Sequence, residues 1–346
     1  MTLPLVSVVI PTYLREETLC DTLADVMQED YPNFEVLVVD QTRQHKPEVE
    51  AYLNELAEAD KIRWFRVDFA SLPGARNYAI RRAQGDIILF IDDDVKFDKG
   101  LLKAHVQSFL DKPDVGAVAG RVLDRQIMAN EHPDFVIEEL PPEAMDGGKA
   151  WYYLNVTHTI KPQYIISARG CNMSFRREIF EQHGIYFDER MRGSAVREES
   201  DVCLRVQRKA GYRIWYNPEA VLVHLGEPTG GCHDISTRSL EYQITHYHNH
   251  FWMAFKNLTL GENLRLYVRL FDCHVLGHPP CNKSPSLHKT IVRGFFYFWG
   301  YFSAVGTAIK SLWDNGQIYT SQDVEMPTFS FPKIEKNAEV DSSVTS

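Results

Sequence analysis

Short apolar runs alternate with longer segments of helical period through the first third of the chain. The runs have the length and composition of buried strands and span residues 6–10, 35–40, 62–67, 87–91 and 116–119. The segments between them carry apolar residues at helical spacing and predict helices over 17–30, 47–59, 73–83 and 99–110. Because the strands are continuously apolar, this β-α-β order predicts a mostly parallel central sheet with helices on both faces.

The pattern becomes less regular after residue 122. A stretch with Pro and Gly pairs over 123–164 is expected to connect two halves of one domain, 1–125 and 126–237. Within the second half, residues 165–175, 202–209 and 220–224 predict a strand, a helix and a strand. The region 238–320 is aromatic and predicted to be mainly helical, and the polar composition of 321–346 predicts a disordered tail.

Three carboxylates follow one another where the 87–91 strand ends. Asp92, Asp93 and Asp94 would repel one another beside an apolar strand unless a cation or solvent compensates their charge. Oxygen ligands of this kind suit Mg²⁺ or Mn²⁺, while a solvated acidic turn is the simpler interpretation of the same residues. Ligands of such sheets gather beyond the carboxyl ends of the strands, where this chain also places Pro11, Thr12, Tyr13 and Asp40. Asp40 could bind a nucleotide base or merely cap a turn.

Composition narrows the function further. The chain has 346 residues, of which 44% are hydrophobic, so it can bury a large core. Its formal charge of -10 argues against a broad nucleic-acid-binding surface. No GxGxxG or GxxxxGK[ST] motif follows the first strand, so phosphate would have to be bound by a metal or by cations such as Arg15 and Arg76.

The six cysteines form no CxxC pair, which argues against a disulfide scaffold and indicates a reduced, cytoplasmic setting. Cys273, His274, His278 and Cys281 lie close together in sequence, but their spacing matches no common structural zinc site. The N-terminus carries no pattern of a secretory signal.

One aromatic segment bears on membrane contact. No apolar run reaches the length of a spanning helix, and the nearest candidate, 294–309, is short and carries three glycines. It is flanked by Arg293 and Lys310 and predicts either an element in a membrane interface, on the cytoplasmic face, or a helix that packs on the domain.

Several motifs in order resemble those of the inverting family 2 glycosyltransferases with the GT-A fold. They are VSVVIPTY at 6–13, VVD at 38–40, LPGARN at 72–77, FIDDD at 90–94, GCNMSFRR at 170–177 and EESDVCLR at 198–205. The QxxRW motif of the family's processive members is absent, which favours transfer of a single sugar.

The resemblance implies an α/β GT-A fold with a Rossmann-like sheet and a helical C-terminal region. It implies that 1–125 binds a UDP-sugar and that 126–237 binds a hydroxyl acceptor, a glycan, glycolipid or lipid-linked sugar. The donor would be surrounded by Pro11, Thr12, Tyr13, Arg15, Asp40, Arg76, Asn77, Asp92 and Asp93. The acceptor would lie beside Gly170, Cys171 and Asn172, and Mn²⁺ or Mg²⁺ would be held by Asp94, Asp92 and His224.

Inversion requires one base that takes the proton of the attacking hydroxyl. The resemblance assigns this role to Glu199, with Glu198 as the alternative, although the family usually has Glu-Asp at this place. Two acids at a helix N-terminus are also favoured by the helix dipole alone. Two other functions stay open: a catalytically inactive relative that binds nucleotide-sugar, and a nucleotidyltransferase.

Overall fold

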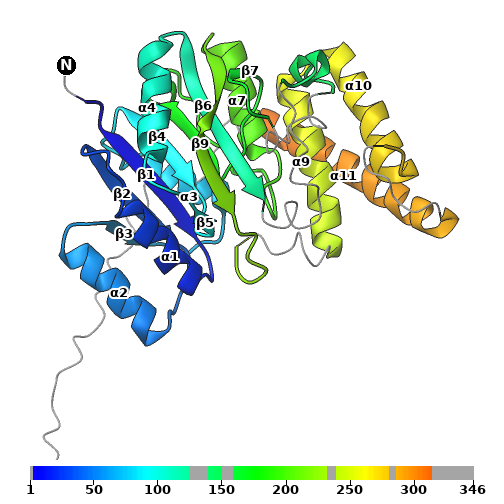
Figure 1. Cartoon of the computed structure of the whole chain (residues 1–346). Coiled ribbons are helices and arrows are strands. Elements are labelled where there is room, and N and C mark those ends of the chain that lie inside the picture. Colours follow the sequence, from blue (N-terminus) through cyan, green and yellow to red (C-terminus); the bar gives the residue numbers. More distant parts are fainter. Residues whose placement is uncertain (1–2, 125–138, 150–158, 232–238, 280–285, 314–346) are drawn as a thin grey trace, which may run out of the picture.

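A mixed sheet of nine strands forms the centre of the molecule (Figure 1). The computed structural model describes residues 3–124, 139–149, 159–231, 239–279 and 286–313, so the predicted tail and most of the 123–164 connector lie outside the described residues. The strands are β1 Val6–Thr12, β2 Phe34–Asp40, β3 Arg63–Arg66, β4 Ile87–Ile91, β5 Val95–Lys96, β6 Val115–Asp124, β7 Gln163–Ile165, β8 Asn172–Arg176 and β9 Arg213–His224.

Strand order explains how the polar strand ends come together. The order is β3-β2-β1-β4-β8-β6-β9-β5, with β7 paired to β9. The predicted parallel pairing is present among β1, β2, β3 and β4 and between β6 and β9. The strand predicted over 165–175 is instead two strands, β7 and β8, and β8 runs antiparallel to both β4 and β6. The motif at 170–177, which was predicted to lie beside the acceptor, therefore begins at the same edge of the sheet where β4 ends.

Helices cover both faces of the sheet, as the continuous apolar strands predict. One face packs against α1 Glu17–Val26, α2 Pro47–Glu58 and α4 Leu101–Asp111. The other packs against α3 Leu72–Ile80, α6 Glu178–Glu181 and α7 Glu198–Lys209. On β1, Val8 and Ile10 join the first core and Val9 joins the second, because successive side chains point to opposite faces.

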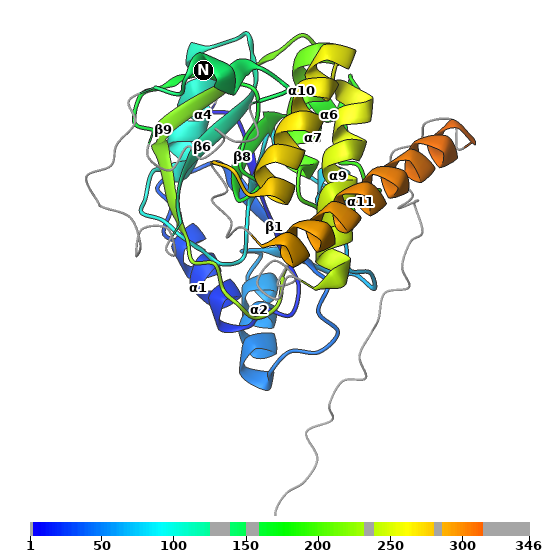
Figure 2. The ribbon, with the colours of Figure 1, turned by 90° about the vertical axis from the view of Figure 1, so that its right-hand side faces the viewer.

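A third apolar core lies under the C-terminal helices, which gather at one end of the molecule (Figure 2). These helices are α9 Leu240–Asn257, α10 Leu260–Leu270 and α11 Leu287–Trp313, with a π-helix, η4 Phe271–Leu276, after α10. A short 3-10 helix, η1 Pro142–Met145, precedes them in the chain. Phe251 of α9 lies between Tyr297 and Tyr301 of α11, with ring centroids 5.1 and 5.2 Å away. None of the described helices combines the length and apolar character needed to cross a bilayer.

The cysteines correct one expectation. Cys20, Cys171 and Cys203 are free thiols, whereas Cys273 is disulfide-bonded, so the expectation of a fully reduced chain is wrong at this residue. A disulfide sulfur cannot act as a thiolate ligand, which removes Cys273 from the zinc cluster considered above. Cys281 lies outside the described residues.

A buried ionic network joins α7 to α9. Asp201 of α7 is fully buried and accepts from Arg205 at 2.6 Å, from Lys256 at 2.7 Å and from Asn257 at 2.6 Å. Burial opposes the charge of Asp201, but the charges of Arg205 and Lys256 outweigh it and lower the pKa to about 2. The network holds the start of the C-terminal region against the helix that begins with Glu198 and Glu199.

Replacing this carboxylate should remove both stability and part of its pH dependence. A carboxylate whose folded-state pKa is depressed contributes stability that is fully present above its ordinary pKa and is lost as the pH falls toward the folded-state pKa, so part of this contribution is already missing at about pH 3. We expect Asp201→Asn to lower the free energy of unfolding by about 3 kcal/mol at neutral pH and to flatten its decline toward acid. Urea unfolding at both pH values, with exposed Asp30→Asn as the control, measures this; an unchanged pH slope in Asp201→Asn would contradict it.

Candidate active site

Two strand pairings bring a histidine to the acidic triplet. Short β5, directly after Asp94, pairs antiparallel with β9 and sets Val95 opposite His224. His224 Nε2 then lies 3.5 Å from Asp94 Oδ1 and 4.0 Å from Asp92 Oδ2. One ligand atom from each of the three side chains lies within 4.8 Å of the others. The predicted metal ligands are therefore together, and within the triplet it is Asp92 and Asp94 that face His224.

A second carboxylate orients His224 from behind. The parallel register of β6 and β9 pairs Asp124 with His224, and His224 Nδ1 lies 3.1 Å from Asp124 Oδ1. Burial opposes a charge on His224, but hydrogen bonds to Asp124 and Asp94 raise its pKa well above the usual value. With Nδ1 held by Asp124, Nε2 points at the triplet. Asp92, Asp94 and Nε2 of His224, with Asp124 behind the imidazole, form a donor set that fits Mn²⁺. A bound Mn²⁺ would take the place of the proton on Nε2.

Arg15 compensates the rest of the triplet. Its guanidinium lies 2.7 Å from Asp94 Oδ2 and 3.4 Å from Asp93 Oδ1. Burial opposes the charge of Asp94, yet hydrogen bonds and charges from His224 and Arg15 hold its pKa well below the usual range. Burial raises the pKa of Asp93 to about 7, against the opposing charge of Arg15. Arg15, predicted to bind phosphate, is thus already engaged with two carboxylates.

A glycine pair closes over the turn after β1. Gly231 N donates to Tyr13 O at 2.7 Å, and Gly230 has φ +68°, a left-handed conformation that favours glycine. A Cβ at Gly230 would lie 2.2 Å from Leu14 O, so no larger residue fits there. Pro11 and Thr12 are buried beneath this turn, and Tyr13 is half-buried.

The carboxylate of Asp40 is hydrogen-bonded to other groups of the protein. Both its oxygens accept hydrogen bonds, from Thr42 N at 2.8 Å, Trp64 Nε1 at 3.0 Å and His45 Nε2 at 2.7 Å. Asp40 is fully buried, and its contact with Thr42 N matches the turn cap considered as the alternative, whereas direct contact with a base stays a prediction. His45 was not predicted from the sequence. Burial opposes its charge, but Asp40 and then Glu16 raise the pKa of this histidine.

Two predicted ligand contacts, Asn77 and Asn172, are likewise structural. Asn77 exchanges hydrogen bonds with the backbone of Phe187, at 2.9 Å in both directions, and donates to Glu189. Asn172 donates to Arg121 O and Ala220 O and accepts from His105 Nε2. Both are fully buried, and in this structure their side chains join strand ends and loops around the site.

Arg76 connects the two predicted halves of the site. It is fully buried, forms an ion pair with Glu198, lies 3.5 Å from Asp92 Oδ1 and donates to Gly170 O at 3.0 Å. Glu198 is consequently buried and held, whereas Glu199 is partly exposed and accepts a hydrogen bond from Ser200 Oγ at 3.3 Å. The neighbouring thiol, Cys171, is buried, and burial raises its pKa to about 11, so it is not a nucleophile at neutral pH.

The loop before α7 has strained backbone. Ala195 has φ 52° and Arg197 has φ 76°, both in the left-handed region that costs energy for residues with a side chain. Arg197 Nε donates to His250 Nε2 of α9 at 3.0 Å. This contact holds the residue immediately before Glu198 and Glu199, and sequence alone gave no signal for it.

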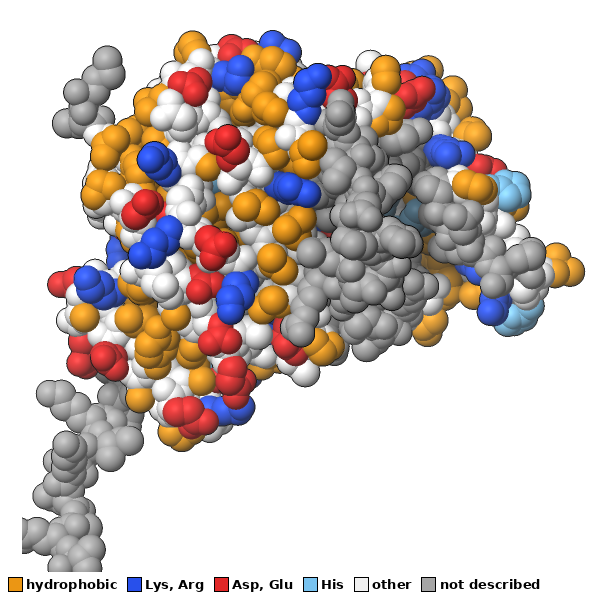
Figure 3. All heavy atoms as spheres, in the orientation of Figure 1, with side chains coloured by type: hydrophobic (Ala, Val, Ile, Leu, Met, Phe, Trp, Pro, Cys, Tyr) orange, Lys and Arg blue, Asp and Glu red, His pale blue; other side chains and the backbone are white. Residues whose placement is uncertain are grey.

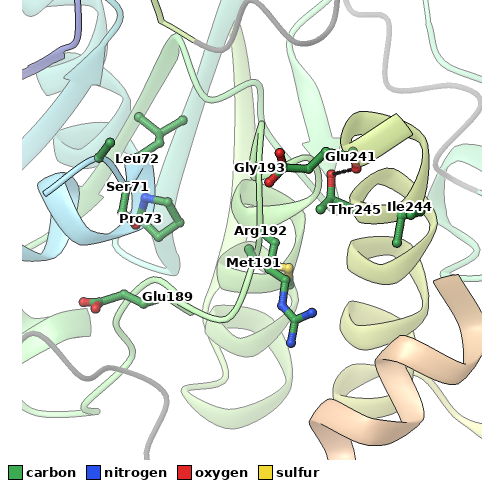
Figure 4. Close-up of a pocket in the computed structure, with 11 residues that line it drawn as sticks. Ser71, Leu72, Pro73, Glu189, Met191, Arg192, Gly193, Glu241, Ile244 and Thr245 are labelled. Carbon is green, nitrogen blue, oxygen red and sulfur yellow. Dashed lines mark hydrogen bonds between the residues drawn. The ribbon is translucent and has the colours of Figure 1, made fainter. Parts of the chain in front are cut away.

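An open cavity of about 620 Å³ lies beside these elements. Its walls come from the start of α3, from the 189–193 segment and from the start of α9, as Figure 4 shows. The polar side chains on its walls are Ser71, Glu189, Arg192, Glu241 and Thr245. Neither the triplet nor His224 lines it, so it is separate from the metal-ligand cluster yet shares the α3 segment that carries Arg76.

The chain is similar to known proteins across the elements described above. The model of the family described as glycosyl transferase family 2 matches residues 7–184, just over half of the chain. A glucosyl-dolichyl phosphate glucuronosyltransferase of Haloferax volcanii is 23% identical over 276 residues, covering 77% of this chain and 78% of the relative. The poly(ribitol-phosphate) β-N-acetylglucosaminyltransferase TarS of Staphylococcus aureus is 26% identical over 194 residues, but this chain spans only 30% of its length.

Solved structures share the fold. A TarS 1–349 crystal structure aligns over 89% of this chain and 82% of its own with a TM-score of 0.55 and 18% identity. The same protein has been solved with UDP, with a TM-score of 0.52 over 92% of this chain and 94% of its own and 17% identity. A mannosyltransferase of Pyrobaculum calidifontis, in complex with GDP-Man and Mn²⁺, aligns over 91% of this chain and 88% of its own with a TM-score of 0.51 and 19% identity.

Asp124 gives a test of the cluster that needs no catalysis. Removing the carboxylate behind a ligating histidine weakens metal affinity by about 10–100-fold, because tautomer and orientation are lost. We therefore expect Asp124→Asn to weaken Mn²⁺ binding in the presence of UDP by that factor, measured from the free Mn²⁺ resonance signal. Asp98→Asn, an exposed acid after β5, serves as the control. Equal Mn²⁺ affinity in the two variants would show that His224 is not a ligand.

Proposed function

The chain belongs to glycosyl transferase family 2, and from this premise we propose that it moves one sugar from a UDP-sugar to a hydroxyl acceptor with inversion. It is a glycosyltransferase with the GT-A fold. The observation that carries the proposal is the meeting of Asp92, Asp94 and His224 at the end of β4, next to the Arg76 link to Glu198.

The donor diphosphate is proposed to bind at this cluster. Two carboxylates and an imidazole suit Mn²⁺, and the neighbouring structures with UDP or with GDP-Man and Mn²⁺ support a nucleotide-sugar and a divalent cation. When bound, the cation would neutralise the charge that develops on the departing nucleoside diphosphate. The protein itself orients the carboxylates, through Arg15 and Arg76, and the imidazole, through Asp124.

Glu199 is proposed to be the base. In a single displacement the acceptor oxygen forms the bond to the anomeric carbon, its proton moves to the carboxylate, and the bond to the diphosphate oxygen breaks with its electron pair. Glu198 is buried against Arg76, so its charge is committed to the ion pair. Glu199, half-buried at the start of α7, is the carboxylate of the pair that remains accessible to an acceptor.

The cavity beside α3 is proposed to receive the acceptor. Its walls come from the proposed donor half, through 70–73, and from the proposed acceptor half, through 189–193, with α9 closing the third side. Glu189, Arg192 and Glu241 offer hydrogen-bonding groups of the kind that bind sugar hydroxyls, and Ile244 and Met191 offer apolar surface. These residues would add to the predicted acceptor contacts, of which Asn172 is buried in this structure.

One observation favours a second function. The Glu198–Glu199 pair replaces the usual Glu-Asp of the family, and the extra methylene moves the base by about 1 Å, a displacement that can cost about 100-fold in rate. A binding-only relative would retain nucleotide affinity without turnover.

A donor panel separates these functions. With Mn²⁺ present, we expect the protein to release UDP slowly from one UDP-sugar by hydrolysis and faster once a suitable acceptor is added. UDP is measured directly in the reaction mixture, and EDTA should abolish its release. Tight UDP binding without release from any donor across a broad acceptor panel would favour the binding-only relative.

Substitution of the proposed base should separate binding from chemistry. We expect Glu199→Gln to keep the affinity for UDP but to lower kcat by about 100-fold to 10,000-fold, the usual contribution of a positioned base. UDP titration and steady-state rates measure the two effects. Glu55→Gln, at an exposed position of α2, is the control and should behave as the natural chain does. Full turnover in Glu199→Gln would make the assignment wrong.

A further inference from the structure

Helix α11 exposes an apolar row on the side that faces away from the domain. Its other side is buried against α9 and η4 through Phe296, Tyr297, Gly300 and Ala304. At 100° per residue the exposed apolar side chains fall on one face, opposite the buried one. They are Leu287, Ile291, Phe295, Phe298, Trp299, Phe302, Ile309, Leu312 and Trp313.

The exposure of this row is large. Phe302 is 67% exposed, Leu312 80% and Trp313 83%, and Figure 2 shows the later part of α11 extending past the other described helices. Scattered exposed apolar residues are normal on soluble proteins, but a continuous row of aromatic and aliphatic side chains marks an interaction surface.

Charge identifies the occupant of this surface. The chain carries a net charge of -10, yet the 27 residues of α11 contain no Asp or Glu and include Lys289, Arg293 and Lys310. In Figure 3, hydrophobic and basic side chains lie together at the end of the molecule formed by α10 and α11. A helix with an apolar aromatic face, flanking cations and too little apolar length to span is the type that lies in the interface of a bilayer.

We propose that α11 docks on the surface of an anionic lipid bilayer with its exposed apolar row in the headgroup region, while Lys289 and Lys310, on the opposite side of the helix, add positive charge close to that surface. Trp299 and Trp313 suit this depth because their rings are apolar and carry one polar N–H.

The docked helix is connected to the proposed acceptor cavity. Arg192, on the cavity wall, donates to Ser303 Oγ at 3.4 Å and to Thr307 Oγ1 at 3.2 Å, both on α11. His248 of α9 contacts the same Thr307 Oγ1 at 2.8 Å. Docking through α11 holds this wall of the cavity near the bilayer, which fits an acceptor carried on a lipid. The lipid-linked acceptor rests on the proposed function, whereas the docking of α11 does not.

Vesicle flotation of the full-length protein tests the docking. We expect it to float with vesicles of phosphatidylglycerol and phosphatidylcholine in equal amounts. The triple variant Phe298→Ser, Trp299→Ser, Phe302→Ser should bind about 100-fold more weakly, because it removes three large apolar side chains from the interface. The matched control replaces three apolar residues of similar exposure elsewhere, Leu110→Ser, Met145→Ser and Ile160→Ser, and should float as the natural chain does.

A second variant tests the contribution of the cations of α11 to vesicle binding. Lys289→Gln with Lys310→Gln should weaken binding to these anionic vesicles by about tenfold or more and leave binding to pure phosphatidylcholine unchanged. A natural chain that stays unbound, or a triple variant that floats equally well, overturns the proposal. So does a natural dimer that becomes monomeric in the triple variant without any vesicle binding, since the row would then be an interface between two copies. UDP release from a soluble donor, measured on the same variants without vesicles, checks their folding and tests the proposed function separately.

Discussion

The buried guanidinium of Arg76 is the interaction on which the site depends. It is 1% exposed and meets Asp92 at the end of β4, Glu198 at the start of α7 and the carbonyl of Gly170 before β8. Removing a buried cation from such a set leaves uncompensated carboxylates, which costs far more than the net energy of the intact pair. Phe90 and Phe187 place ring faces 5.7 and 5.3 Å from the guanidinium carbon and exclude water from it. One side chain thus fixes the relative position of the metal-ligand cluster and the proposed base.

The acidic triplet is an electrostatic problem that the fold solves mostly with its own cations. Arg15 lies against Asp93 and Asp94, Arg76 against Asp92, and His224 between Asp92 and Asp94. The carboxylates that would hold a divalent ion therefore already have fixed partners on the protein. The protein holds the ligand oxygens in place in advance, which lowers the cost of ordering them when a nucleotide diphosphate arrives.

The local sequence pattern was sufficient to predict most helices and strands of the first third of the chain. It was insufficient to predict which strands and side chains pair over long distances in the sequence. Apolar runs and helical periods predicted β1 to β4 and their helices within a few residues, because those signals are local. The separation of β7 from β8, and the antiparallel entry of β8 between β4 and β6, depend on pairings between residues far apart in the sequence, such as Ile165 with Ile214 and Ile91 with Asn172. Asp124 and His45 were missed for the same reason. The motifs that contain Asn77 and Asn172 give the type of side chain but not its direction, and the internal hydrogen bonds of both residues could not be predicted from them.

The C-terminal helices are joined to α7, the helix that begins with Glu198 and Glu199, by buried charge as well as by apolar packing. Asp201 of α7 and Asp188 of the preceding loop both bind Lys256 of α9, and Trp252 of the same helix donates to Asp188 at 2.8 Å. Charges removed from water tolerate little change of geometry, since their hydrogen bonds weaken steeply when misaligned. A surface bound to α11 is therefore mechanically connected, through α9, to the loop that presents Glu199. Under the proposed docking, a membrane bound to α11 would therefore also constrain the position of Glu199, the proposed base.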